Sequence, residues 1–187
     1  KHVFSTLVIA VGFTAIITQI VLLREFISVF SGNELVMGVL LSNWMLLTGA
    51  GAYFGKYFKI SASSIAKILW IHFITSLFPA VVLFTTSYTR YLFFPFGLDL
   101  NLFQVFYYSF IVILPFCFLS GLLFTLYSSY FSQSRKENLI KNVYALESTG
   151  SILGGLIFNL ALIYFLNTSE SLLLVSAINL LIILFAL

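Results

Sequence analysis

The apolar run VFSTLVIAVGFTAIITQIVLL (residues 3–23) decides the fold class of this chain. A helix needs about 20 apolar residues to cross a bilayer core about 30 Å thick, and this run reaches that length before it meets Arg24 and Glu25. Similar runs follow, and residues 172–187 are mostly apolar without alternating polarity. The sequence therefore predicts a helical membrane protein, because the strands of a membrane β-barrel alternate between polar and apolar positions.

The composition agrees with this class. Hydrophobic residues make up 61% of the chain, charged residues 8%, and the mean hydropathy is +1.10. Soluble domains contain about 25% charged residues. The formal net charge is +3. In a membrane protein the distribution of Lys and Arg matters more than their total, so this charge does not indicate a nucleic-acid partner. The single cysteine, Cys117, allows no intramolecular disulfide and no thiol cluster for a metal.

Six apolar runs predict six membrane helices in one all-α domain, over residues 3–23, 35–53, 65–85, 101–127, 143–166 and 171–187. Arg24 and Glu25 are expected to end the first helix at the membrane surface. The aromatic-rich segment 86–100 is expected to be a loop at the interface, where such rings prefer to lie. The lipid bilayer is thus the first predicted partner of the chain.

The basic residues predict the orientation of the bundle, because short cytoplasmic loops carry an excess of Lys and Arg. Of the 9 basic residues, only Arg24 and Arg90 fall on one side of the six spans. The side that holds the others is expected to be cytoplasmic, and it includes both termini. A domain following residue 187 would then lie in the cytosol.

Arg24, Glu25, Asn33 and Glu34 form a polar cluster between the first two apolar runs. One interpretation is structural: the charged pair ends one helix, the following residues cap the next, and a salt bridge from Arg24 to Glu25 or Glu34 fixes the angle between the helices. The sharper alternative is a ligand site, in which Glu25 and Glu34 act as paired carboxylates for a cationic substrate.

Glu147 is the leading candidate within the apolar spans. It is expected about one turn inside the fifth helix, where a carboxylate costs several kcal/mol unless it is protonated, solvated or paired. One interpretation places it at the cytoplasmic interface, paired with Lys141 or with a lysine of residues 56–67. The other gives it a role in a proton relay or in contact with a polar substrate.

Two pairs of glycines have the spacing of close helix packing, namely Gly51 with Gly55 and Gly150 with Gly154. We expect them to pack helices within the bundle or between subunits. The sequence shows no catalytic triad, metal-ligand spacing or phosphate-binding loop, so it predicts no catalytic, cofactor or metal residue in this chain. His72, close to Trp70, is expected to be an interfacial side chain and not a haem ligand.

Several of these motifs together resemble bacterial integral-membrane proteins related to spermidine synthase. The resemblance to that family's first two helices rests on Arg24-Glu25-Phe26, Phe30-x-Gly32-Asn33-Glu34-Leu35, Gly38, Trp44 and Gly49-x-Gly51. The resemblance to its fourth and fifth helices rests on Leu114-Pro115-Phe116-Cys117, Gly121-x-x-Phe124 and Tyr144-Ala145-Leu146-Glu147-Ser148-x-Gly150-Ser151-x-x-Gly154-Gly155. The similarity covers residues 7–166.

In that family the membrane part is followed by a Rossmann-like aminopropyltransferase domain that binds decarboxylated S-adenosylmethionine and a polyamine. The catalytic residues of that domain have no counterparts in this sequence. The resemblance implies a membrane domain of the bacterial cytoplasmic membrane that anchors or serves such a cytosolic domain and handles a cationic small molecule. The competing interpretation is a non-catalytic small subunit of a larger membrane complex, with the charged cluster as a structural clasp.

Overall fold

The computed structural model of the chain describes residues 2–30, 34–58, 65–93, 101–135 and 140–186. These residues form helices and no strand. The elements are α1 (His2–Val29), α2 (Glu34–Gly55), α3 (Ile65–Phe93), α4 (Leu102–Arg135), α5 (Ile140–Ile157), the π-helical turn η2 (Phe158–Leu162), α6 (Ile163–Phe165) and α7 (Thr168–Ala186). Because α5, η2 and α6 follow one another directly, six segments are long and apolar enough to cross a membrane. The predicted six-helix, all-α fold is confirmed.

The first and fourth helices are longer than the sequence predicted. α1 continues past Arg24 and Glu25 to Val29, so the prediction that this charged pair ends the helix is wrong. α4 likewise continues beyond residue 127 to Arg135. Arg and Glu favour helix about as well as Leu does, and their long side chains reach water from a helix that keeps its backbone hydrogen bonds. The end of an apolar run therefore marks a membrane surface and not the end of a helix.

Three other boundaries also differ. α3 extends to Phe93, so the predicted loop over residues 86–100 is helical in its first half, and residues 94–100 lie outside the described ranges. α5 begins at Ile140 rather than residue 143. α7 begins at Thr168, where the Glu170 carboxylate accepts a hydrogen bond from the Asn167 backbone N–H (2.9 Å) and so helps to start the helix.

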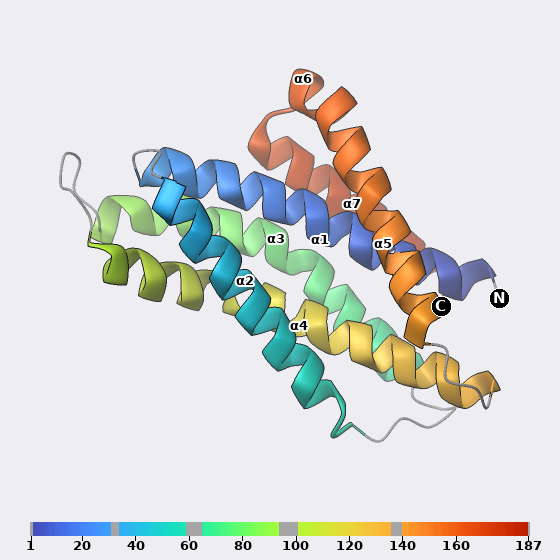
Figure 1. Cartoon of the computed structure of the whole chain (residues 1–187). Coiled ribbons are helices and arrows are strands. Elements are labelled where there is room, and N and C mark those ends of the chain that lie inside the picture. Colours follow the sequence, from blue (N-terminus) through green and yellow to red (C-terminus); the bar gives the residue numbers. More distant parts are fainter. Residues whose placement is uncertain (1, 31–33, 59–64, 94–100, 136–139, 187) are drawn as a thin grey trace.

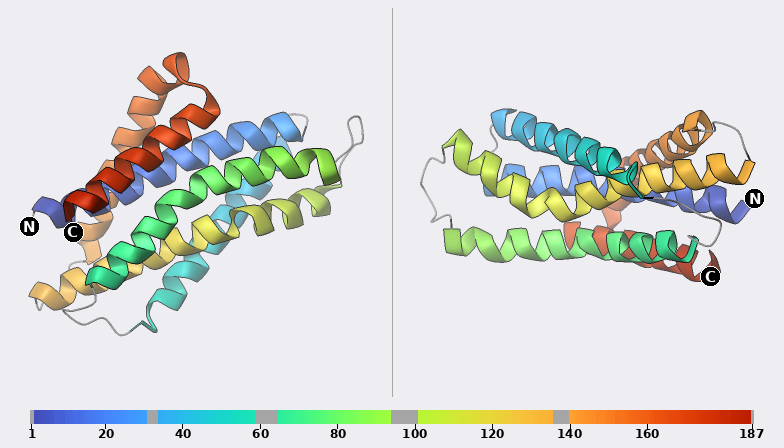
Figure 2. Two further views of the ribbon diagram at one scale, coloured as in Figure 1. Left: turned by 180° about the vertical axis from the view of Figure 1, so that it is seen from behind. Right: turned by 90° about the horizontal axis from the view of Figure 1, so that it is seen from below.

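The helices are arranged in three layers (Figures 1 and 2). α2 and α5 lie on one side, α1 and α4 lie in the middle, and α3 and α7 lie on the other side. In the most apolar stretches of α1 and α4, 56% of the residues are buried inside the chain, more than in any other span. The middle layer is therefore the core of the bundle. Both termini lie at the same end of the bundle, as an even number of crossings requires.

The two halves of the chain repeat one another with reversed direction. α1 packs on α5 and α7, α4 packs on α2 and α3, and α3 packs on α7. Exchanging the first three spans for the last three converts the α1–α5 pairing into α4–α2 and the α1–α7 pairing into α4–α3. The α3–α7 pairing is unchanged by the exchange. Because α1 and α4 run in opposite directions (Figure 1), the second half is an inverted copy of the first. Such inverted repeats, related by a pseudo-two-fold axis, are a common plan of membrane transporters.

The crossing of α2 and α4 depends on two glycines. A Cβ atom on Gly51 would collide with the carbonyl oxygen of Phe118, and one on Gly121 would collide with the carbonyl oxygen of Thr48. Only glycine permits this approach, in which Cα–H groups face carbonyl oxygens of the other helix. Gly51 thus packs on residue 118, three positions before Gly121, and Gly121 packs on residue 48, three positions before Gly51.

The crossing of α1 and α5 has the same construction. A Cβ atom on Gly12 would collide with the carbonyl oxygen of Glu147, and one on Gly150 would collide with that of Ile9. The offset of three positions is repeated, with Gly12 corresponding to Gly121 and Gly150 to Gly51. This agreement at the level of single residues supports the inverted repeat.

The second members of the predicted glycine pairs lie one turn further along the same contacts. A Cβ atom on Gly55 would be 2.7 Å from Cβ of Thr125, and one on Gly154 would be 2.7 Å from Cγ2 of Ile16. All four glycines singled out in the sequence therefore pack against helices of the same chain. Gly12 and Gly121, the glycines on the opposite sides of the two crossings, were not predicted as packing residues from the sequence.

We expect the substitution Gly121→Ala to destabilise the bundle by roughly 1–3 kcal/mol, because the added methyl group must push α2 and α4 apart. Gly49→Ala on α2 is the matched control, because a Cβ atom there meets nothing within 4 Å. The measurement is reversible unfolding in mixed micelles of increasing SDS content. Equal stability of the two variants would show that the close crossing is absent.

The orientation predicted from Lys and Arg can be tested with single cysteines at the two ends of the bundle. Ser28→Cys on α1 and Gln133→Cys on α4 are exposed sites at opposite ends, and the native Cys117 is buried. In intact cells a membrane-impermeant maleimide is expected to label position 28 at once and position 133 only after permeabilisation. The reverse pattern would invert the orientation.

Candidate functional site

A cleft of about 410 Å³ lies between the two glycine crossings. It is bordered by all four helices that form these crossings. Glu147, the carboxylate within the apolar part of α5, is one of its lining residues. Residues that the internal repeat relates to each other both line it, such as Thr48 with Glu147 and Ala52 with Ser151. The lining residues are Ala15, Ile16, Gln19, Trp44, Thr48, Gly49, Ala52, Ser120, Gly121, Phe124, Tyr144, Glu147 and Ser151.

Glu147 lies further from the start of its helix than the sequence predicted. It follows Ile140, the first residue of α5, by roughly 10 Å along the helix axis at about 1.5 Å per residue. The prediction of about one turn assumed that the helix begins at residue 143. Its side chain is half-buried, and its Cγ atom lies 3.1 Å from where a Cβ atom on Gly12 would be. The close approach of α1 thus restricts the Glu147 side chain, which is one of the residues that line the cleft.

No described cation pairs with Glu147. Lys141 is neither three nor four positions from it on α5, so the two side chains are not neighbours on the helix surface. The Lys56 ammonium lies over the ring of Tyr53, 3.4 Å from its centroid. The described lysines therefore do not form the predicted interfacial ion pair, and Lys59 lies outside the described ranges. Among the described residues, the Glu147 carboxylate has no counter-charge in the cleft.

The neighbouring polar groups leave acceptors in the cleft. The Thr48 hydroxyl donates to the Trp44 carbonyl oxygen (2.8 Å), and the Ser151 hydroxyl donates to the Gly12 carbonyl oxygen (3.2 Å). Both hydroxyl protons are thus engaged, while the hydroxyl oxygens can still accept. Together with the carboxylate they form a set of acceptors suited to a ligand that carries N–H donors.

Aromatic rings border the same cleft. Trp44, Phe124 and Tyr144 contribute to its lining, and faces of aromatic rings attract cations. The volume is in the range of small-molecule sites, which run from about 300 to 1,000 Å³. One carboxylate, hydroxyl acceptors and aromatic walls together favour a small organic cation over an anion or a purely apolar molecule.

The charged cluster at the other end of α1 is separate from this cleft. Gly12 lies beside Glu147, and Arg24 lies roughly 18 Å further along α1 at about 1.5 Å per residue. Arg24 and Glu34 are exposed and Glu25 is half-buried, while Asn33 lies outside the described ranges. No ion pair within 4.0 Å joins the described charges of this cluster. The structure therefore does not bring Glu147 together with Arg24, Glu25 or Glu34.

A second polar group, which was not predicted from the sequence, is buried in the core. His72 was expected at the interface, but it is only 1% exposed, and its Nδ1 lies 2.8 Å from the hydroxyl of Tyr127. Asn179 lies beside the His72 ring, and its Nδ2 donates to the Thr14 hydroxyl at 2.6 Å. The side chains come from α3, α4, α7 and α1 in turn. This polar chain joins the middle layer to the α3/α7 layer.

A pattern in the sequence could have revealed this group. His72 and Ser76 are four positions apart in an otherwise apolar run, as are Thr14 and Thr18, so each pair shares one helix face. Polar side chains in membrane helices face the bundle interior far more often than lipid. Two such pairs on different spans indicate a shared contact, although not which helices meet.

No family model, curated protein or solved structure matches this chain. Fold and site together define its class as an all-α protein with six helices suited to cross a membrane, consistent with an integral, multi-pass membrane protein. Within the described residues no group of three or more His, Cys, Asp or Glu side chains could hold a metal ion.

We expect Tyr127→Phe to lower the stability of the bundle by roughly 1–3 kcal/mol, because it leaves the buried His72 Nδ1 without its partner. Tyr107→Phe on the same helix removes an exposed hydroxyl and is expected to have little effect. Unfolding in mixed micelles measures both variants. If the two behave alike, the polar chain does not hold these helices together.

Proposed function

We propose that this chain is a membrane domain that binds a small organic cation of the amine type in the Glu147 cleft and serves a cytosolic aminopropyltransferase-like domain. The observation that carries the proposal is the Glu147 carboxylate, which faces an open cleft with no described counter-charge. The sequence resemblance to spermidine synthase-related membrane proteins supplies the substrate class, since polyamines are amines with positive charge at neutral pH.

The proposal is supported by the cost of an unpaired carboxylate in a membrane. Removing a charge from water costs several kcal/mol, and a nearby opposite charge with good hydrogen bonds offsets this cost. An ammonium group within the cleft would supply both the charge and N–H donors for the hydroxyl oxygens of Thr48 and Ser151. The aromatic walls would contact the methylene groups of the same molecule.

The position of the cleft along the bundle fits a cytosolic partner. Glu147 is nearer to the Ile140 end of α5, which is the end at which the basic residues gather. By the distribution of Lys and Arg this end is cytoplasmic. In the bacterial cytoplasmic membrane to which the resemblance assigns the protein, an amine bound here would be close to a transferase on the cytosolic side.

The alternative of a non-catalytic complex subunit with a charged clasp has less support. A clasp requires an ion pair from Arg24 to Glu25 or Glu34, and no such pair joins their described side chains. The stability of the bundle is explained by the glycine crossings and the buried polar chain. The outer charged cluster is then free to face water at the membrane surface.

Binding of radiolabelled spermidine to the full chain in lipid nanodiscs tests the proposal. We expect Glu147→Gln to weaken binding at least tenfold, or ~1.4 kcal/mol, because the substitution keeps the size of the side chain and removes its charge. Glu170→Gln is the control, since Glu170 is exposed and a glutamine keeps an acceptor for the Asn167 N–H. Unchanged binding in Glu147→Gln, or no binding by the wild type, would contradict the proposal.

A further inference from the structure

Two layers of polar side chains lie inside the bundle where α1, α3 and α7 meet. Each layer takes one residue from each helix: Thr14, His72 and Asn179 form the first layer, and Thr18, Ser76 and Ser176 form the second. Residues three or four positions apart share a helix face, and α7 runs opposite to α1 and α3 (Figure 1), so the second layer lies one turn further from the termini. All six side chains are buried, and none is more than 6% exposed.

The first layer is held together by hydrogen bonds, yet two of its polar atoms are left over. Asn179 Nδ2 donates to the Thr14 hydroxyl at 2.6 Å, and His72 Nδ1 lies 2.8 Å from the Tyr127 hydroxyl. Asn179 also lies beside the His72 ring. Among the described residues, His72 Nε2 and Asn179 Oδ1 have no hydrogen-bond partner. The two leftover atoms thus belong to neighbouring side chains in the interior.

The second layer has the same shortage of partners. The Ser76 hydroxyl donates to the Phe73 carbonyl oxygen of its own helix (2.7 Å), whereas Thr18 Oγ1 and Ser176 Oγ have no partner in the described part of the chain. Six buried side-chain atoms of the described residues lack a partner, and four of them belong to these two layers. Because an unpaired buried polar atom costs free energy, native proteins pair nearly all such atoms with protein groups or ordered water. This concentration therefore indicates a shared ligand.

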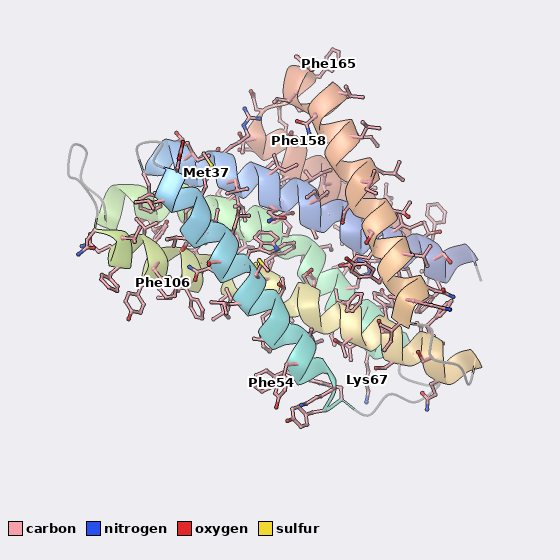
Figure 3. All side chains as sticks on the ribbon, viewed as in Figure 1. Met37, Phe54, Lys67, Phe106, Phe158 and Phe165 are labelled. Carbon is pink, nitrogen blue, oxygen red and sulfur yellow. The ribbon has the colours of Figure 1, made fainter. Side chains whose placement is uncertain are left out.

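Apolar clusters enclose the two layers along the bundle. On the side of the termini, Ile68 and Ile183 belong to one cluster of buried residues. Beyond the second layer, Leu83 and Leu172 belong to another cluster, which also contains Phe158 (labelled in Figure 3). A ligand between the layers is therefore enclosed by protein, which favours a small bound molecule over an open pore.

The leftover atoms require a ligand that both donates and accepts hydrogen bonds. Asn179 Oδ1 only accepts, the hydroxyls of Thr18 and Ser176 do either, and the role of His72 Nε2 depends on its tautomer. A metal cation offers no donor, and the backbone carbonyls here are engaged in the continuous helices α1 and α7. A charged ligand would also meet no opposite charge in either layer.

We propose that the two layers bind ordered water. A buried water makes about three hydrogen bonds, so two waters that are bonded to each other have enough bonds left for all four atoms. The waters then join α3 and α7 to α1 through the interior of the bundle. None of the six side chains lines the Glu147 cleft, so the water site is occupied whether or not the cleft binds an amine.

Paired substitutions test the water site through the sign of their effect on stability. Thr18→Val keeps the size of the side chain, and removal of a hydroxyl that has no partner would raise the unfolding midpoint in mixed SDS micelles. With water bound, we expect Thr18→Val and Ser176→Ala each to lower the midpoint, because each leaves the water with one partner fewer. The double variant should lower it by less than the sum of the two. A midpoint raised by Thr18→Val, or fully additive shifts, would overturn the proposal.

Thr86→Val on α3 is the matched control. Thr86 is 0% exposed, as Thr18 is, but its hydroxyl donates to the Val82 carbonyl oxygen of its own helix (2.8 Å). Its effect on the midpoint should simply add to that of Thr18→Val. Coupling as large as that between Thr18→Val and Ser176→Ala would contradict a water shared by the two layers.

Solid-state NMR of the full chain in lipid bilayers detects the water directly. We expect magnetisation to pass from water protons to the side chains of Thr18 and Ser176 and not to Thr86. Absence of transfer to Thr18 and Ser176 would overturn the proposal, as would equal transfer to all three. A wild-type midpoint that rises when sodium replaces N-methylglucamine, with the rise lost in Thr18→Val, would assign the site to a cation and refute the choice of water.

Discussion

Close backbone contact at four glycines is the constraint on which the rest of this structure depends. At each crossing the carbonyl oxygen of one helix occupies the place that a Cβ atom of the other would need. The same contact, with the same offset in sequence, joins α1 to α5 and α2 to α4. Two tight crossings leave a space between them, and that space is the cleft around Glu147. The scaffold and the site are thus consequences of one packing rule.

Polar contacts reinforce one of the glycine crossings and also join the layer that the glycines do not reach. Asn43 on α2 donates to the Ser109 hydroxyl on α4 at 2.8 Å, and the chain through His72 and Asn179 joins α3 and α7 to the middle layer. Within the bilayer core no bulk water can hydrogen-bond to these polar side chains. A pairing of helices that satisfies them is therefore favoured over pairings that leave them without partners. Small residues bring the helices together, and hydrogen bonds specify their partners.

The sequence alone was sufficient for the class and the number of spans, because long apolar runs have few alternatives in a membrane. It also identified Gly51, Gly55, Gly150 and Gly154 as packing residues from their spacing. Helix ends were predicted less well, since hydropathy reports the membrane surface and Arg24 and Glu25 continue a helix readily. The sequence did not show which helices pack together, because neither Gly12 nor Gly121 has a second glycine four positions away to mark it as a packing residue. One of the two interpretations of Glu147 paired it with a lysine. The described lysines do not pair with it, and the sequence could not show this because side-chain pairing depends on tertiary packing.

The most direct test of the central claim is a crosslink across one glycine crossing. In a Cys117→Ser background with a protease site placed between α2 and α3, the pair Asn43→Cys and Ser109→Cys should be joined by oxidation or by a short thiol-reactive crosslinker, because the native side chains are hydrogen-bonded at 2.8 Å. The account predicts that the cleaved halves then migrate as one species, and that the pair Leu46→Cys and Ser109→Cys, with Leu46 on the exposed face of α2, gives two separate fragments. Separation of the fragments in both variants would contradict the crossing, and with it the cleft and the inverted repeat.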